Sequence, residues 1–168
     1  DDAAVIKSQN NILVSSDMLV EGVHFDMSFT PLKHLGYKSV IVNISDIYAM
    51  NAIPTHITVN LGISSKYTLE AIDELYDGIL LACKKYKVDI IGGDITSCLN
   101  GLTISITVIG EGNENEIVRR SGAKENDLLV TTGDLGGAYM GLNVLQREKE
   151  VWKNNQNMQQ ELDKCNYI

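Results

Sequence analysis

Residues 55–64 read Thr-His-Ile-Thr-Val-Asn-Leu-Gly-Ile-Ser, and apolar and polar side chains alternate through this stretch. A period of two places the apolar residues on one face of an extended chain, so the stretch predicts a half-buried strand. The next apolar residues recur at helical spacing between Thr68, a candidate N-cap, and Cys83. Acidic residues come early in this segment and lysines come late, an order that the helix dipole favours. The helix is the best-defined element that the sequence predicts.

The same patterns predict further elements on both sides of this pair. Strands are predicted at residues 11–16, 88–91, 102–109 and 128–131, and helices at residues 38–50 and 138–147. Residues 148–168 are rich in Asn and Gln and favour either a surface helix or a loop insertion. The composition changes near residues 122–127, which marks a candidate domain boundary.

Composition and charge exclude several classes of protein. The 168 residues include 22 acidic and 14 basic side chains, and 44% are hydrophobic. These values fit a globular protein and argue against general nucleic-acid binding, which needs basic faces. The three cysteines lie far apart without a C-x-x-C pair, which argues against a disulfide framework or a structural zinc site. We therefore expect a cytoplasmic protein. Because the chain opens on Asp1-Asp2 without Met, we also expect a fragment of a longer protein.

Four aspartates are candidate ligands of a divalent cation. Asp17 and Asp94 follow predicted strands, and Asp46 interrupts an apolar helical stretch, where a carboxylate is costly unless it is paired. Together with Asp2 they would form a cage of oxygen ligands suited to Mg²⁺, if they converge. Each aspartate could equally cap a turn or a helix, and for a single residue that is the more common role.

Three other features could contact phosphate. Gly92-Gly93-Asp94 would let the backbone approach a ligand closely, although an ordinary tight turn explains it as well. Arg119-Arg120 offers planar donor groups, although such a pair is usually a solvated surface feature. His24 follows the first predicted strand, and a lone histidine is more often structural than functional.

Taken in order, several segments resemble one family, the thiamine-monophosphate kinases of the aminoimidazole-ribonucleotide-synthetase-like superfamily. The segments are Asp-Asp-Ala-Ala-Val (1–5), Ser-Ser-Asp-Met-Leu-Val-Glu-Gly-Val-His-Phe (15–25), Val-Asn-Ile-Ser-Asp-Ile-Tyr-Ala-Met (42–50), Gly-Gly-Asp-Ile-Thr (92–96) and Arg-Ser-Gly-Ala-Lys (120–124). The resemblance spans about residues 1 to 147. Each piece alone is a weak signal, but the ordered set is specific.

The resemblance implies an activity and a set of site residues. The activity is direct in-line transfer of a phosphoryl group from ATP to thiamine monophosphate, giving thiamine diphosphate, without a covalent protein nucleophile and with several Mg²⁺ ions. The implied metal ligands are Asp2, Ser15, Ser16, Asp17, Asp46 and Asp94. The implied nucleotide contacts are Gly93, Asp94 and Arg120, and the implied substrate contact is His24. Ile95 stands where the family usually has Thr.

The resemblance also implies an α+β fold. Residues 1–118 would form an N-terminal mixed α/β domain that binds ATP and Mg²⁺ and whose strands form a barrel in a homodimer. Residues 119–168 would begin a second α+β domain. Two alternatives stay open. One is another ATP-using enzyme of the superfamily, resembling selenophosphate synthetase or aminoimidazole ribonucleotide synthetase. The other is a non-catalytic module that binds Mg²⁺-nucleotide or only dimerises.

Overall fold

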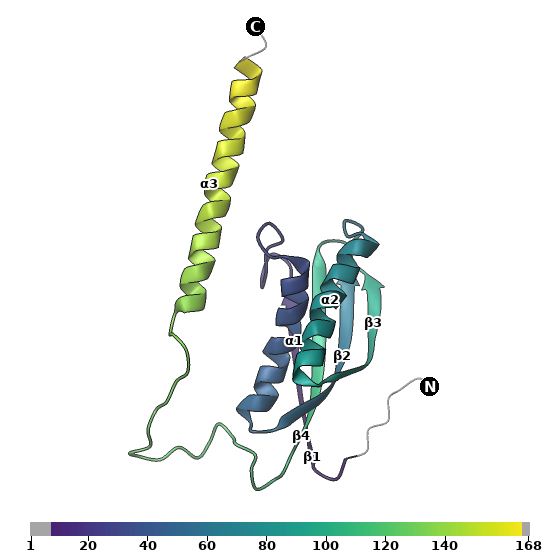
Figure 1. Cartoon of the computed structure of the whole chain (residues 1–168), viewed down its shortest axis with the longest axis vertical. Coiled ribbons are helices and arrows are strands. Elements are labelled where there is room, and N and C mark those ends of the chain that lie inside the picture. Colours follow the sequence, from purple (N-terminus) through teal and green to yellow (C-terminus); the bar gives the residue numbers. More distant parts are fainter. Residues whose placement is uncertain (1–7, 166–168) are drawn as a thin grey trace. The chain divides into compact units, whose positions relative to one another are not determined.

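The computed structural model describes the backbone of residues 8–165 and the side chains of residues 8–156. Its elements, in chain order, are β1 (Asn11–Val20), α1 (Leu32–Ala49), β2 (Ile53–Ile63), α2 (Leu69–Tyr86), β3 (Asp89–Ser97), β4 (Leu102–Gly112) and α3 (Gly137–Cys165) (Figure 1). The chain divides into two units, Asp1–Gly122 and Ala123–Ile168. The first unit therefore contains the whole sheet with α1 and α2, and the second contains α3.

The first unit is a four-stranded sheet covered by two helices. The strand order is β1-β4-β2-β3. β4 pairs antiparallel with both β1 and β2, whereas β2 and β3 are parallel and are connected through α2. Figure 1 shows α1 and α2 side by side on one face of the sheet. The order places β1 and β3 at opposite edges.

The core lies between the sheet and these two helices. Every second residue of β4 from Leu102 to Val108 is at most 1% exposed, as the alternation of residues 102–109 predicts. Leu35 of α1 and Ile79 of α2 are fully buried against this face. The helices cross at close range, because a Cβ atom on Gly78 would lie 1.9 Å from the carbonyl oxygen of Lys33. A glycine is required at this crossing.

The predicted helix after residue 68 is confirmed, including its cap. The Thr68 hydroxyl accepts a hydrogen bond from the Ala71 amide at 3.3 Å. Lys87 ends the helix in the left-handed conformation, and its amide donates to the carbonyl of Cys83. These local signals fix both ends of α2.

Other predictions differ from the structure. β1 continues through Asp17 to Val20, and β3 continues through Asp94 to Ser97, so neither aspartate ends its strand. The predicted strand at residues 128–131 is wrong, because these residues are irregular and have no strand partner in the described part of the chain. The Asn- and Gln-rich residues are helical to Cys165, which excludes the loop insertion. The domain ranges 1–118 and 119–168 stay a prediction. Among the helices of the described residues, none combines the length and the apolar character needed to cross a bilayer.

Candidate functional site

A cleft of about 890 Å³ opens between β1, the end of α1 and the segment that follows β4. Its lining residues are Asn11, Ile12, Leu13, Val14, Ser15, Asp46, Ile47, Ala49, Met50, Glu114, Ile117, Val118, Arg119 and Arg120. Three residues of the expected site, Ser15, Asp46 and Arg120, are among them. The fold thus brings together polar groups that are far apart in the sequence.

A direct contact joins β1 to α1 in this cleft. The Ser15 hydroxyl donates a hydrogen bond to Asp46 Oδ2 at 2.6 Å. Two residues along the strand, the amide of Asp17 donates to Asn43 Oδ1 at 2.9 Å. The side chain of Asn43 is buried, and its Nδ2 in turn donates to the Ser39 carbonyl at 2.8 Å. The edge of β1 is therefore docked on α1. Asp46 is exposed, so its carboxylate does not carry the burial cost that its apolar neighbours in the sequence suggest.

The third wall is the segment after β4, which is tied to both other walls. The Glu114 carboxylate accepts hydrogen bonds from Asn11 Nδ2 and from Arg119 Nη2, the second at 3.0 Å. The Val118 amide donates to the carbonyl of Met50 at 3.0 Å. Sequence reasoning missed Glu114 and Asn11, because the residues that this contact joins are 103 positions apart and no local pattern marks them.

Arg120 lies next to this anchored segment and is exposed. It forms no ion pair within the part of the chain that the structure describes. An arginine fork with uncommitted donors at the edge of a cleft can bind the oxygens of a phosphate group.

The two serines after Val14 point to opposite faces of the sheet. Ser15 faces α1, whereas the Ser16 hydroxyl lies 3.0 Å from Thr107 Oγ1 on the other face. Asp17 shares the face of Ser15, because side chains alternate along a strand. Two hydroxyls on opposite faces cannot both reach one cation through their side chains. Of Ser15, Ser16 and Asp17, only Ser15 and Asp17 have side chains on the face of the sheet that α1 and Asp46 cover.

Asp94 lies away from these residues within one copy of the chain. It pairs across the sheet with Asn60 of β2, in the same cross-strand row as Met18 of β1. Asp94 therefore lies at the opposite edge of the sheet from Asp17, and its side chain is on the opposite face. Among the residues that the structure describes, no three His, Cys, Asp or Glu side chains form a metal-binding group. Asp17, Asp46 and Asp94 therefore do not form one metal-binding group within residues 8–156, and Asp2 lies outside the described residues.

Gly93 has a structural reason for being glycine. A Cβ atom at this position would lie 1.9 Å from the carbonyl oxygen of Val59 in the paired strand. The close approach of β2 and β3 therefore needs Gly93 whether or not it also contacts a ligand.

His24 lies in the turn that follows β1. Its Nδ1 accepts a hydrogen bond from the Val20 amide at 3.0 Å, and the side chain is exposed. The turn leads back into the core at Phe25, which is 7% exposed.

The donor set on β1 and α1 fits Mg²⁺. This ion prefers oxygen ligands and is usually held by one or two carboxylates, with waters and substrate phosphates completing an octahedron. Asp46 and Asp17 would supply carboxylates to such an ion, and Ser15 would supply a hydroxyl. Two carboxylates and a hydroxyl leave room for phosphate oxygens, which suits a metal-bound nucleotide.

Comparison with known proteins identifies similar sequences and folds. Residues 1–111 match the model of the family described as AIR synthase related protein, N-terminal domain. Thiamine-monophosphate kinase of Bacillus subtilis (strain 168) is 39% identical over 150 residues, which cover 88% of this chain and 46% of the relative.

Two solved structures have the same fold. Thiamine monophosphate kinase from Aquifex aeolicus superimposes with a TM-score of 0.78 at 32% identity, covering 86% of this chain and 48% of that one. A structure described as AaThiL complexed with AMPPCP and TMP gives the same TM-score and identity and covers 87% of this chain and 46% of that one. The chain thus spans about half the length of the relatives that it matches.

Proposed function

The chain belongs to the AIR synthase related protein family, and on this premise we propose that the polypeptide carrying it transfers the γ-phosphoryl group of ATP to thiamine monophosphate. Relatives named as thiamine-monophosphate kinases support this activity, as does a related structure with AMPPCP and TMP. The observation that carries the proposal is the convergence of Ser15, Asp46 and Arg120 on one cleft. The product is thiamine diphosphate, and a cytoplasmic location belongs to the same proposal.

The expected site residues would each have a physical role in direct in-line transfer, although Asp17 and His24 do not line the cleft. Such transfer needs positioning and charge neutralisation more than a protein nucleophile. Arg120 binds phosphate oxygens of the nucleotide, and His24 contacts the phosphate of the acceptor. Asp46, Asp17 and Ser15 would hold Mg²⁺, with Asp2 and the backbone carbonyl of Ser16 as further ligands. When bound, the metal neutralises charge on the triphosphate and on the acceptor phosphate.

A homodimer completes the proposal. The sheet face away from the helices carries Ile12, Val14 and Met18, which are 47%, 64% and 54% exposed. Leu13 and Leu19 point the other way and are buried. We assign this apolar face to a second copy, with the two sheets forming a barrel. Because Asp94 cannot reach Asp46 within one copy, we assign Gly93 and Asp94 to the nucleotide bound in the partner's cleft.

The first test measures ADP formation from ATP, Mg²⁺ and thiamine monophosphate by the complete polypeptide. Asp46→Asn is expected to weaken Mg²⁺-dependent nucleotide binding by at least about tenfold while the fold remains intact. Asp77→Asn is the matched control, because Asp77 forms only an exposed ion pair with Lys33 at 3.8 Å. Unchanged nucleotide and Mg²⁺ affinity in Asp46→Asn would remove this residue from the site. Absence of transfer in the unmodified polypeptide would reject the kinase.

The shared site has a separate test by subunit complementation. Asp46→Asn and Asp94→Asn polypeptides are each expected to be nearly inactive. In a mixed dimer, one cleft combines an intact Asp46 with an intact Asp94, so activity returns on mixing. If mixing restores nothing although mixed dimers form, Asp94 does not act across the interface.

A further inference from the structure

The turn after β1 is built so that His24 stands on its outer side. Gly22 adopts a φ of 79°, and its amide donates to the carbonyl of Phe25 at 2.8 Å. The amide of His24 donates to the carbonyl of Val20 at 2.9 Å. Because Phe25 is anchored in the core, the turn has fixed ends on both sides of the histidine.

One hydrogen bond sets the tautomer of this histidine. The backbone N–H of Val20 can only donate, so His24 Nδ1 at 3.0 Å is the acceptor and carries no proton. A neutral imidazole then carries its proton on Nε2. The exposed side chain offers an N–H donor to a ligand, and not a base.

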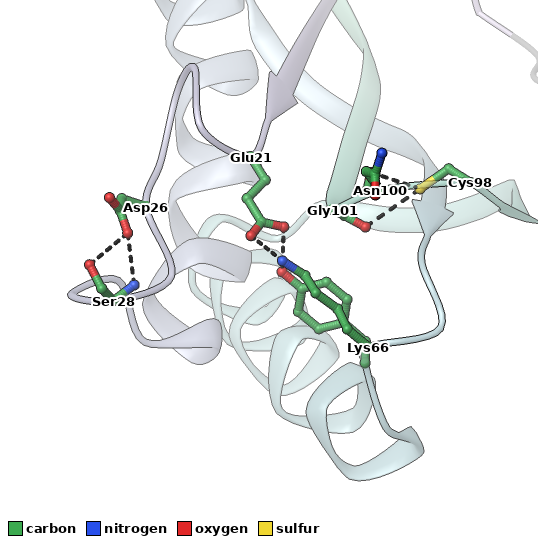
Figure 2. Close-up of polar contacts among 8 residues, drawn as sticks. Glu21, Asp26, Ser28, Lys66, Cys98, Asn100 and Gly101 are labelled. Atoms are coloured by element: carbon green, nitrogen blue, oxygen red, sulfur yellow. Dashed lines mark hydrogen bonds and ion pairs between the residues drawn. The ribbon is translucent and has the colours of Figure 1, made fainter.

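Two hydrogen bonds to the Glu21 carboxylate, from Lys66 and Tyr67, hold the first residue of the turn, and we call this group of three side chains the clamp. Glu21 accepts a hydrogen bond from Lys66 Nζ and another from the Tyr67 hydroxyl, the latter at 2.7 Å. Figure 2 shows Glu21 reaching from the end of β1 toward Lys66 in the loop before α2. The Glu21 side chain is only 17% exposed. The clamp therefore connects the turn to the β2–α2 loop.

The surrounding backbone leaves space for this carboxylate. A Cβ atom on Gly101 would lie 3.0 Å from Glu21 Oε2, and the Glu21 amide donates to the Leu102 carbonyl at 3.0 Å. Burial alone raises the pKa of the Glu21 carboxyl, but the hydrogen bonds from Lys66 and Tyr67 outweigh it and hold the pKa below its usual value. Burial and the neighbouring carboxylate raise the pKa of Tyr67, so the phenol remains a donor. The clamp is thus ionised and complete at neutral pH.

We propose that Glu21 is a positioning residue that fixes the 21–25 turn through Lys66 and Tyr67, so that His24 presents its Nε2–H to the phosphate of the acceptor. The part concerning the acceptor rests on the proposed kinase function. His24 donates a hydrogen bond to a phosphate oxygen and transfers no proton. Loss of the clamp lets the turn and the ring move, which weakens binding of the acceptor but not of ATP.

Steady-state kinetics of the complete polypeptide test the acceptor part. Glu21→Ala is expected to raise the KM for thiamine monophosphate about tenfold, the effect of one charge-assisted hydrogen bond, with kcat and the KM for ATP within about twofold. Tyr67→Phe keeps the Glu21–Lys66 pair and should give a smaller rise, which covers the case that Glu21→Ala folds poorly. His24→Gln should raise the same KM, and Asp77→Asn serves as the surface control. If His24→Gln raises this KM while both clamp variants leave it unchanged, the positioning role is wrong and the kinase stands.

Spectroscopy tests the clamp without any assay of transfer. Long-range ¹H–¹⁵N spectra of the unmodified polypeptide are expected to show the neutral His24 ring protonated on Nε2 alone. Tyr67→Phe and Glu21→Ala should give a mixture of tautomers and about tenfold faster exchange of the Val20 amide. A single unchanged tautomer in both variants would overturn the proposal. Absence of kinase activity with the expected spectra would reject the acceptor part and leave the clamp.

Discussion

In the unit Asp1–Gly122, the side chains of Leu35, Ile79 and Val108 are completely buried, whereas in Ala123–Ile168 the side chains of Leu128 and Leu129 are 90% and 98% exposed. The same types of residue thus lie in opposite environments in the two units. In the first unit a sheet and two helices share one core. In the second, large apolar side chains of α3 within the described residues are also exposed, Tyr139 by 68% and Leu142 by 42%.

This difference separates local from long-range causes of structure. A helix satisfies its backbone hydrogen bonds within itself, so α3 forms from its own sequence. A strand needs a neighbouring strand for its backbone groups, and residues 128–131 have none among the described residues. The apolar pattern is present in both segments, but only the helix can satisfy its backbone hydrogen bonds within itself.

The largest expected effect comes from truncating one apolar side chain in each unit. Ile79→Ala should lower the free energy of unfolding by about 2–5 kcal/mol, because Ile79 is fully buried between α2 and the sheet. Leu142→Ala in α3 should change it by less than about 0.5 kcal/mol, because Leu142 is 42% exposed. Urea unfolding followed by circular dichroism measures both. A comparable loss from Leu142→Ala would show that α3 packs in a core of its own.

A smaller effect, with opposite signs in the two units, is expected from adding one methyl group to a helical glycine. Gly78→Ala in α2 should destabilise the chain by about 1–3 kcal/mol, since the new Cβ meets the Lys33 carbonyl. Gly141→Ala in α3 has nothing within 4 Å of its new Cβ and should stabilise the helix by about 0.5–1 kcal/mol. Thermal melting of helical ellipticity, together with fluorescence of Trp152, the single tryptophan, reports the two changes. Equal signs would contradict the contrast between the units.

The elements that the sequence predicted well are those with local signals at both ends. Thr68 marks the start of α2, and Lys84 and Lys85 mark its last turn, so the sequence predicts both ends of this helix. α1 begins at Leu32, six residues before the predicted start at Lys38. The prediction missed this start because no local signal marks it: the N-cap residue, Pro31, makes no side-chain cap hydrogen bond, and the first turn has no acidic residue. β1 extends past Asp17 because β4 pairs with it along its whole length, which no local pattern indicates.

The candidate site was predictable only in part, for the same reason. Resemblance to a family selected Ser15, Asp46 and Arg120, and the fold brings them to one cleft. Sequence spacing could not show that Asp94 lies on the far edge and the other face of the sheet, because that depends on strand order. Nor could it reveal the contact between Asn11 and Glu114, which forms only after β1 and β4 have paired.

The smallest expected effect compares one carboxylate in each unit as the pH falls. The pKa of Glu21 is lowered in the folded chain, so its stabilisation is fully present above the ordinary pKa of a glutamate and is lost as the pH falls through the folded-state pKa. Glu21→Gln should therefore cost about 1 kcal/mol at pH 7 and progressively less in acid. Glu150→Gln removes an exposed i,i+3 pair with Lys153, 3.6 Å long, and should cost less than about 0.5 kcal/mol at either pH.

Urea unfolding of both variants at pH 7 and in acid measures the difference. Gln keeps the size of the side chain and one acceptor oxygen but removes the charge, so the pH-dependent part reports the ionised clamp alone. A cost for Glu21→Gln that stays constant with pH would mean that packing, and not the ionised carboxylate, stabilises the turn after β1. The partly buried Glu21–Lys66 pair would then contribute no more to the free energy of unfolding than the exposed Glu150–Lys153 pair. The two units would differ in stability only through their buried apolar side chains.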